Sequence, residues 1–383
     1  MSESKNLSDF PSPNSLPELI SQLKQTDIPE NEYGSYISRF LDTTARRDGV
    51  PLYGKSELTP LCNLDCKMCY VHLNKSQLSD SLMPLECWKK IIDECIKCGM
   101  LEATFTGGEC LTHPDFDELY IYTYNKNVKI SIYTNGLLLD EKRIELLKKY
   151  PPADIQISLY GSCDEAYEKV TGFAVFNKVY NNMLALKNAG LKFRIAITPN
   201  VYMLPDAEKL IRCAKEMGVP YSINAMLFNP RENTGRHDKP LDISLDDYVR
   251  LYKYRYTLDK REFTPVDFNS LPDFGSPKQR HKGLLCGGGR CSFSIGYDGK
   301  MYICGMLRNK TAFPLDIGFK RAWEIINTEA ESILYPPECS ECEYRKKCPV
   351  CIVHHFKEAD GYRLNPFMCE RIKRMLSEGL ETF

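Results

Sequence analysis

Between residues 56 and 228, amphipathic stretches of helical periodicity alternate with short apolar segments. Amphipathic stretches of helical period recur there, and in the first of them Trp88, Ile91, Ile92, Cys95 and Ile96 fall on one face. Short, mostly apolar segments between these stretches predict strands at residues 56–61, 102–107, 128–134, 154–160, 192–198 and 221–227. Repeated strand–helix units predict an α/β fold whose parallel sheet is covered by helices, either barrel-like or doubly wound.

The segments on either side lack this alternation of predicted strands and helices, so we expect them to form separate regions. Residues 1–55 are polar and rich in Pro and Ser, with helices expected only at 16–25 and 33–47, so we interpret them as an N-terminal extension. Residues 56–260 hold the strand–helix region and a connecting segment with a helix at 245–260. Residues 261–383 predict a small Cys-rich domain that contains a hairpin with its tight turn at Asp298-Gly299.

Composition excludes several classes of partner and site. The 50 Lys and Arg residues nearly balance 51 Asp and Glu residues, which gives no electrostatic footprint for nucleic acid. The sequence has no signal-peptide pattern and no apolar stretch long enough to span a membrane, so we expect a cytoplasmic protein. In that reducing compartment, 17 cysteines favour metal ligation and buried packing over disulfides.

Three of these cysteines, Cys62, Cys66 and Cys69, follow the first predicted strand. The C-terminal ends of parallel strands are where α/β folds place their chemistry. Closely spaced thiolates suit zinc or an iron–sulfur cluster. A structural zinc site has four protein ligands, so here His72 or a distant cysteine would have to complete it. A cluster held by three cysteines instead leaves one iron open to a substrate or cofactor.

This loop resembles the signature of the radical S-adenosylmethionine (radical SAM) enzymes, in which the methionyl part of the cofactor chelates the fourth iron. Met68 stands where the family usually has an aromatic residue, and it is apolar enough to lie against the adenine. Thr106-Gly107-Gly108-Glu109 follows the second predicted strand and is similar to the family's GGE motif, which engages the cofactor's ammonium. Taken alone, this tetrapeptide is equally typical of an ordinary turn after a strand.

Two more polar residues end predicted strands. Asn135 follows the third strand, and Ser158 lies in the fourth, which is similar to the family's ribose-contacting strand. Both side chains can hydrogen-bond a hydroxyl or carboxylate, although a turn or cap role is at least as common for such residues. The resemblance covers about residues 56–228 and implies a partial (β/α)6 TIM-like barrel.

Eight further cysteines lie beyond residue 285. They resemble the SPASM extension of radical SAM enzymes, although the Cys348-to-Cys351 gap is one residue shorter than usual. The resemblance implies two auxiliary 4Fe-4S clusters, one on Cys286, Cys291, Cys304 and Cys351, the other on Cys339, Cys342, Cys348 and Cys369. A pair of zinc sites is the alternative.

Other candidate residues have less support. Cys95 and Cys98 lie on an amphipathic helix, where packing is the expected role. His354 and His355 adjoin the Cys-rich segment, where we expect either a contact to the auxiliary site or, more commonly, a surface position. No catalytic base is identified from the sequence.

The resemblance implies an enzyme with three 4Fe-4S clusters that generates a 5'-deoxyadenosyl radical and modifies a peptide or protein by crosslinking or thioether formation. Sulfatase-type maturation and peptide-derived cofactor biosynthesis are the alternatives. Gly305 after Cys304, where sulfatase-maturating members have Asp, argues against the first of these. A flavodoxin- or ferredoxin-type electron donor is implied. The N-terminal extension is shorter than the leader-binding module of many peptide maturases, so we expect the leader peptide to be recognised elsewhere or by a separate protein. An iron–sulfur electron carrier without catalysis is the non-enzymatic alternative.

Overall fold

An eight-stranded sheet organises the chain in a computed structural model, which describes residues 10–71, 73, 82–223, 227–228, 241–259, 284, 286–339, 341–342, 344, 348, 350–358 and 361–380. The strand order is β6-β5-β4-β3-β2-β1-β7-β8, and all neighbours pair in parallel except β7 and β8. The strands are β1 Tyr53–Glu57, β2 Glu102–Thr106, β3 Lys129–Thr134, β4 Asp154–Ser158, β5 Arg194–Ile197, β6 Tyr221–Ile223, β7 Ser292–Ile295 and β8 Met301–Tyr302.

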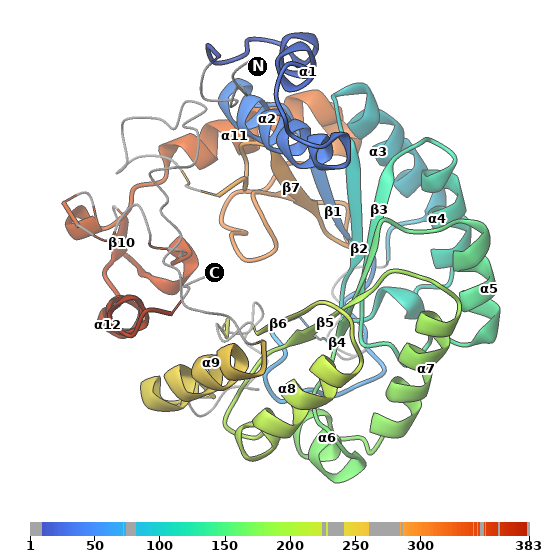
Figure 1. Ribbon diagram of the computed structural model, residues 1–383. Coiled ribbons are helices and arrows are strands. Elements are labelled where there is room, and N and C mark those ends of the chain that lie inside the picture. Colours follow the sequence, from blue (N-terminus) through green and yellow to red (C-terminus); the bar gives the residue numbers. More distant parts are fainter. Residues whose placement is uncertain are drawn as a thin grey trace.

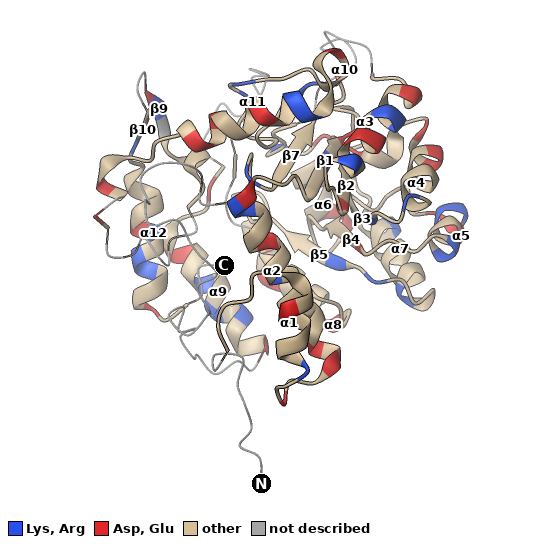
Figure 2. Cartoon of the chain, turned by 90° about the horizontal axis from the view of Figure 1, so that it is seen from above, with Lys and Arg blue, Asp and Glu red and all other residues tan. Residues whose placement is uncertain are grey.

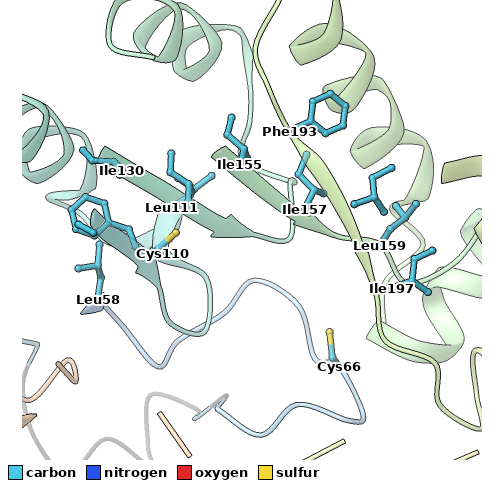
Figure 3. Packing of buried hydrophobic residues seen from close by; sticks show 14 of the residues in the cluster. Leu58, Cys66, Cys110, Leu111, Ile130, Ile155, Ile157, Leu159, Phe193 and Ile197 are labelled. Carbon is cyan, nitrogen blue, oxygen red and sulfur yellow. The ribbon is translucent and has the colours of Figure 1, made fainter. Parts of the chain in front are cut away.

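Helices cover the outer face of this curved sheet, as Figure 1 shows. They are α3 Leu85–Lys97, α4 Phe116–Tyr124, α5 Glu141–Lys149, α6 Asp164–Thr171, α7 Phe176–Asn188 and α8 Ala207–Glu216. The sheet residues Ile130, Ile155 and Ile157 are buried in the core beneath them (Figure 3). Among the described residues, the helices that follow the strands lie on one face of the sheet, and its two end strands, β6 and β8, do not pair with each other. This arrangement is a partial barrel and not a doubly wound sheet.

The observed elements lie close to the predicted ones, with differences at the ends. The first strand begins at Tyr53 and ends at Glu57, earlier than predicted. Pro60 has no N–H to donate to a ladder, so the chain leaves the sheet before it. The helix predicted around residues 175–190 is α7, and Gly190 follows it with a φ of 71°. Residues 224–226 of the last predicted strand lie outside the described residues.

The C-terminal region continues the same sheet. Strand β7 pairs in parallel with β1, so that Tyr53 lies opposite Ser292. The predicted hairpin is confirmed as β7 and β8, with Gly299 in the turn at a φ of 78°. Beyond it lie α10 Pro314–Ile317, α11 Phe319–Ser332, the β9–β10 hairpin (Phe356–Glu358 and Gly361–Arg363) and α12 Pro366–Ser377. The boundary that we predict at residue 261 lies outside the described residues.

The N-terminal extension forms two helices, as predicted. They are α1 Leu16–Leu23 and α2 Tyr33–Asp48, which lie side by side in Figures 1 and 2 and enclose a small core of Leu19, Leu23 and Phe40. The C-terminal end of α2 contacts the Cys-rich region, because the Gly49 carbonyl accepts a hydrogen bond from the indole of Trp323 (2.7 Å).

The remaining elements in the described part of the chain are α9 Leu245–Asp259 and five short 3-10 segments. Those segments are Glu30–Glu32, Cys110–Thr112, Leu204–Asp206, Pro337–Cys339 and Ile352–His354. Figures 1 and 2 place α9 beside α12, on the side where the sheet is open. Acidic and basic residues are interspersed over the face seen in Figure 2, in keeping with the balanced charge. None of the described helices is long and apolar enough to cross a membrane.

Candidate functional site

A cavity of about 640 Å³ lies at the C-terminal ends of the barrel strands. Nine residues singled out by the sequence line it: Cys62, Cys66, Met68, Cys69, Thr106, Gly107, Gly108, Asn135 and Ser158. They come from four different strand–helix connections, so only the folded barrel brings them together. Of the residues predicted around the first cysteine loop, Glu109 does not line the cavity.

Backbone hydrogen bonds from neighbouring segments hold the cysteine loop in place. The amides of Asp65 and Lys67 donate to the carbonyls of Thr171 (2.9 Å) and Val170 (3.0 Å) at the end of α6. The Leu64 amide donates to the sulfur of Cys62 (3.4 Å). The loop is therefore shaped by the protein itself, with its three sulfur-bearing side chains on the cavity wall.

Burial favours the protonated thiol at Cys62 and Cys66 when no metal is bound. It raises the pKa of Cys62 to about 12 and the pKa of Cys66 well above its usual value. A metal must therefore displace the protons as it binds. Within the described ranges, no three Cys, His, Asp or Glu side chains surround the position of a single metal ion. The soft sulfur donors and the open space beside them suit a cluster with one exposed iron. His72, the possible fourth zinc ligand, lies outside the described residues.

Gly107 and Gly108 let the loop after β2 lie directly against the cysteine loop. The Gly108 amide donates to the Thr59 carbonyl (2.6 Å), and a Cβ at Gly108 would stand 2.3 Å from the carbonyl oxygen of Leu61. Gly107 has a φ of 148°, which favours glycine. The two glycines are thus required by contact between two backbones, whatever else approaches them.

Glu109 lies behind the cavity wall and is 1% exposed. Its carboxylate accepts hydrogen bonds from the Thr134 hydroxyl (2.8 Å) and the Asn135 amide (2.7 Å), which fixes the end of β3. Burial raises the pKa of Glu109, and these hydrogen bonds oppose that effect. The structure thus gives Glu109 a positioning role, while its predicted contact with a cofactor ammonium stays a prediction.

Asn135 connects the end of β3 to the cysteine loop. Its side-chain NH2 group donates to the Asn63 side-chain oxygen (2.7 Å) and lies 3.7 Å from the sulfur of Cys62. Its side-chain oxygen accepts from the Leu137 amide (3.0 Å), which is the turn role considered from the sequence. Asn135 therefore has a structural role in addition to its place on the cavity wall.

Several lining residues were missed by sequence reasoning. Tyr133 and Gln156 are inward-facing strand residues, and polar residues at alternate positions of predicted buried strands were the available signal for them. Tyr248, Tyr252 and Arg371 reach the cavity from α9 and α12. No local pattern in the sequence links those helices to the barrel mouth.

The C-terminal cysteines fall into two neighbourhoods. Burial raises the pKa of Cys291 and of Cys351 to about 12. The nearby Cys286 raises both pKa values further, and Cys304 also raises the pKa of Cys351. Burial also raises the pKa of Cys369, with Cys348 and Cys342 adding to that shift. Cys339 lies at the end of a 3-10 segment, and its assignment to the second group stays a prediction, like the other ligand assignments.

Two histidines beside this region are buried, contrary to the surface position that we considered more common. His354 is 8% exposed and His355 is 5% exposed. The His354 ring stacks on Phe228, with ring centroids 4.5 Å apart. The C-terminal region therefore packs against a residue that lines the cavity.

Comparison with known proteins finds a matching family model, similar curated proteins and a similar solved structure. Residues 56–209 match the model of the Radical SAM superfamily. An AdoMet-dependent heme synthase of Methanosarcina barkeri is 27% identical over 80% of this chain and 92% of its own length. The antilisterial bacteriocin subtilosin biosynthesis protein AlbA of Bacillus subtilis is 26% identical over 83% of this chain and 70% of its own. Streptococcus suis SuiB bound to S-adenosylmethionine has the same fold, with a TM-score of 0.68 and 18% identity over 93% of this chain and 86% of that one.

Proposed function

We propose that this chain, whose residues 56–209 belong to the radical SAM superfamily, modifies a peptide or protein by radical chemistry at the cavity described above. Cys62, Cys66 and Cys69 would hold a 4Fe-4S cluster, and SAM would bind at the iron without a cysteine ligand. With one electron from an external donor, the two would supply methionine and a 5'-deoxyadenosyl radical, which would take a hydrogen atom from the substrate to leave 5'-deoxyadenosine. The observation that carries this proposal is the gathering of these cysteines and six predicted cofactor residues in one cavity.

The protein's own residues position the reactants and exclude solvent. Met68 is 7% exposed and offers an apolar surface for the adenine, while the hydroxyls of Thr106 and Ser158 and the amide of Asn135 offer hydrogen bonds. Aromatic side chains on the far wall, among them Phe228 and Tyr248, give the substrate an apolar environment.

A peptide substrate is supported by the relative from Bacillus subtilis, because its name assigns it to the biosynthesis of a bacteriocin. The bond that would be formed, for example a thioether or other crosslink, is part of the proposal and not of the comparison. The proposal also includes an external electron donor of the flavodoxin or ferredoxin type, a separate leader-binding protein and a cytoplasmic location. The name of the Methanosarcina barkeri relative favours a second candidate, a heme-related substrate, because this chain matches 92% of that relative's length.

The eight C-terminal cysteines would hold two further 4Fe-4S clusters. The first would use Cys286, Cys291, Cys304 and Cys351, and the second Cys339, Cys342, Cys348 and Cys369. Support comes from the two neighbourhoods of thiols described above. These clusters would carry electrons or contact the substrate.

Anaerobic reconstitution tests the proposal. We expect about twelve irons per chain and dithionite-dependent formation of 5'-deoxyadenosine from SAM. A variant with Cys62, Cys66 and Cys69 all changed to Ala should lose SAM cleavage and about four irons but keep the remaining iron, because the other cysteines lie elsewhere. A matched variant with Cys87 and Cys213 changed to Ala should keep SAM cleavage and the full iron content. Zinc without iron, or iron without SAM cleavage, would contradict the proposal and favour a zinc protein or an electron carrier.

A further inference from the structure

Arg371 is a buried cation on the wall of the proposed reaction cavity. It lies on α12 and is 4% exposed, yet it lines the same cavity as Cys62, Cys66 and Cys69. Its guanidinium lies over the ring of Tyr248 on α9, 4.9 Å from the ring centroid. Figure 1 shows α9 and α12 as neighbours on the open side of the sheet. A charge from the C-terminal region thus faces the barrel interior.

This guanidinium has no carboxylate partner among the residues that the structure describes. Its Nε is buried without a hydrogen-bond acceptor. Arg374, one turn further along α12, is 43% exposed and pairs with Glu378 (2.9 Å) and Asp246 (3.7 Å). Arg371 differs from Arg374 in this respect, and a buried charge without a partner is destabilising, whereas an exposed ion pair contributes little to stability.

None of the salt bridges among the described residues gives Arg371 an anionic partner, and its described neighbours in the cavity are uncharged aromatic residues. The hydroxyl of Tyr252 donates to the Ile223 carbonyl (2.9 Å). The His354 ring stacks on Phe228, which lines the same cavity. The Nε2 of His354 is also buried without a partner. This end of the cavity is therefore electropositive and has unused hydrogen-bonding capacity.

We propose that Arg371 binds a carboxylate of the substrate. The inference rests on the proposed function, because it takes the cavity to be the place where the substrate reacts. The guanidinium lies over the Tyr248 ring, and its two terminal NH2 groups suit a planar, two-oxygen acceptor, which a carboxylate provides. In a peptide, that carboxylate would be the C-terminal group or an Asp or Glu side chain close to the residue that reacts.

Blocked dipeptides test the proposal on the reconstituted protein and separate the two sources. N-acetyl-alanyl-tyrosine, compared with its C-terminal amide, tests a terminal carboxylate. N-acetyl-glutamyl-tyrosinamide, compared with its glutaminyl analogue, tests a side-chain carboxylate. We expect wild-type protein to bind at least one acid probe more tightly than its amide in equilibrium dialysis. Arg371→Met should weaken that acid probe about tenfold to a hundredfold and leave the amide unchanged.

Two matched variants exclude a general loss of structure. Arg374→Met, on the same helix, should leave binding of every probe unchanged. Arg371→Lys keeps the charge without the planar fork, so it should retain part of the preference for the acid; it also serves if Arg371→Met does not fold. Iron content and melting temperature are measured for each variant.

Three results would overturn the proposal: equal binding of acids and amides by wild-type protein, equal losses in Arg371→Met and Arg374→Met, or a larger loss of affinity for SAM than for the acid probe in Arg371→Met. The last result would assign the charge to the cofactor. Failure of the proposed function is seen separately, as absence of 5'-deoxyadenosine in the wild-type protein, and does not depend on probe binding.

Discussion

At Gly108 the backbone of one loop touches the backbone of another, and a side chain there has no flexible neighbour to displace. We expect Gly108→Ala to destabilise the protein by about 3 kcal/mol, because its Cβ would stand 2.3 Å from the Leu61 carbonyl oxygen. Urea unfolding followed by circular dichroism measures the change. Gly34→Ala on α2 is the control: nothing lies within 4 Å of its Cβ, so it should stabilise by up to about 1 kcal/mol. Equal effects would show that the loops do not touch.

The buried His354 makes stability depend on pH. Its folded pKa of about 4 lies below the usual value of about 6.5, mainly through burial. Between these values the unfolded chain binds a proton that the folded chain does not, so stability is complete above about pH 6.5 and falls toward pH 4.

We expect the wild-type protein to lose about 1 kcal/mol more than His354→Phe when the pH is lowered from 7.5 to 5.5. Phe keeps a ring stacked on Phe228 but does not titrate. Denaturant unfolding of both proteins at the two pH values measures the difference. Parallel losses in the two proteins would mean that His354 is hydrated and charged at the lower pH.

Single residues also show the limit of what the sequence predicts. Cys62, Cys66 and Cys69 were identifiable because their ligand chemistry shows in their spacing. Arg371 was not, because its importance lies in the absence of an acceptor, which only three-dimensional packing reveals. Glu109 was found for its charge, but the hydrogen bonds to Thr134 and Asn135 depend on the pairing of β2 with β3.

Among the elements, helix α2 holds the N-terminal extension against the Cys-rich region. Asp42 and Arg46 on α2 lie beside Cys291, and Ala45 packs with Cys291 and Leu52. We expect removal of residues 1–48 to speed amide hydrogen exchange about tenfold or more in residues 286–292 and in α11, because these contacts are lost.

Removal of residues 1–27 is the control for that truncation. It deletes α1, which packs on α2 through Leu19, Leu23 and Phe40, and leaves α2 in place. Exchange in residues 286–292 should then be unchanged. Mass spectrometry of peptides from both truncated proteins measures the exchange, and equal protection in the two would contradict a role for α2.

Periodicity predicted the elements of the barrel well because each strand and helix shows its own pattern of burial. The ends were less accurate, as at β1, where the strand begins at Tyr53 because Ser292 of a distant segment pairs with it. The partial barrel itself followed from family resemblance, since alternation of strands and helices left a doubly wound sheet equally open.

Across the whole molecule, the C-terminal region is joined to the barrel more closely than its composition indicated. We predicted a separate Cys-rich domain, but β7 and β8 extend the barrel sheet and Arg371 reaches the barrel cavity. Pairing between residues some 240 positions apart has no local signature, so a sequence pattern cannot show it.

The parallel pairing of β1 with β7 also orders events during synthesis. Tyr53–Glu57 leaves the ribosome early, while its partner Ser292–Ile295 follows more than two hundred residues later. Until then β1 is the outer edge of the growing sheet, with free N–H and C=O groups that another chain could pair with. The nascent barrel is therefore prone to aggregation until the Cys-rich region has been made. The segment that carries the proposed auxiliary ligands thus also protects the edge of the sheet.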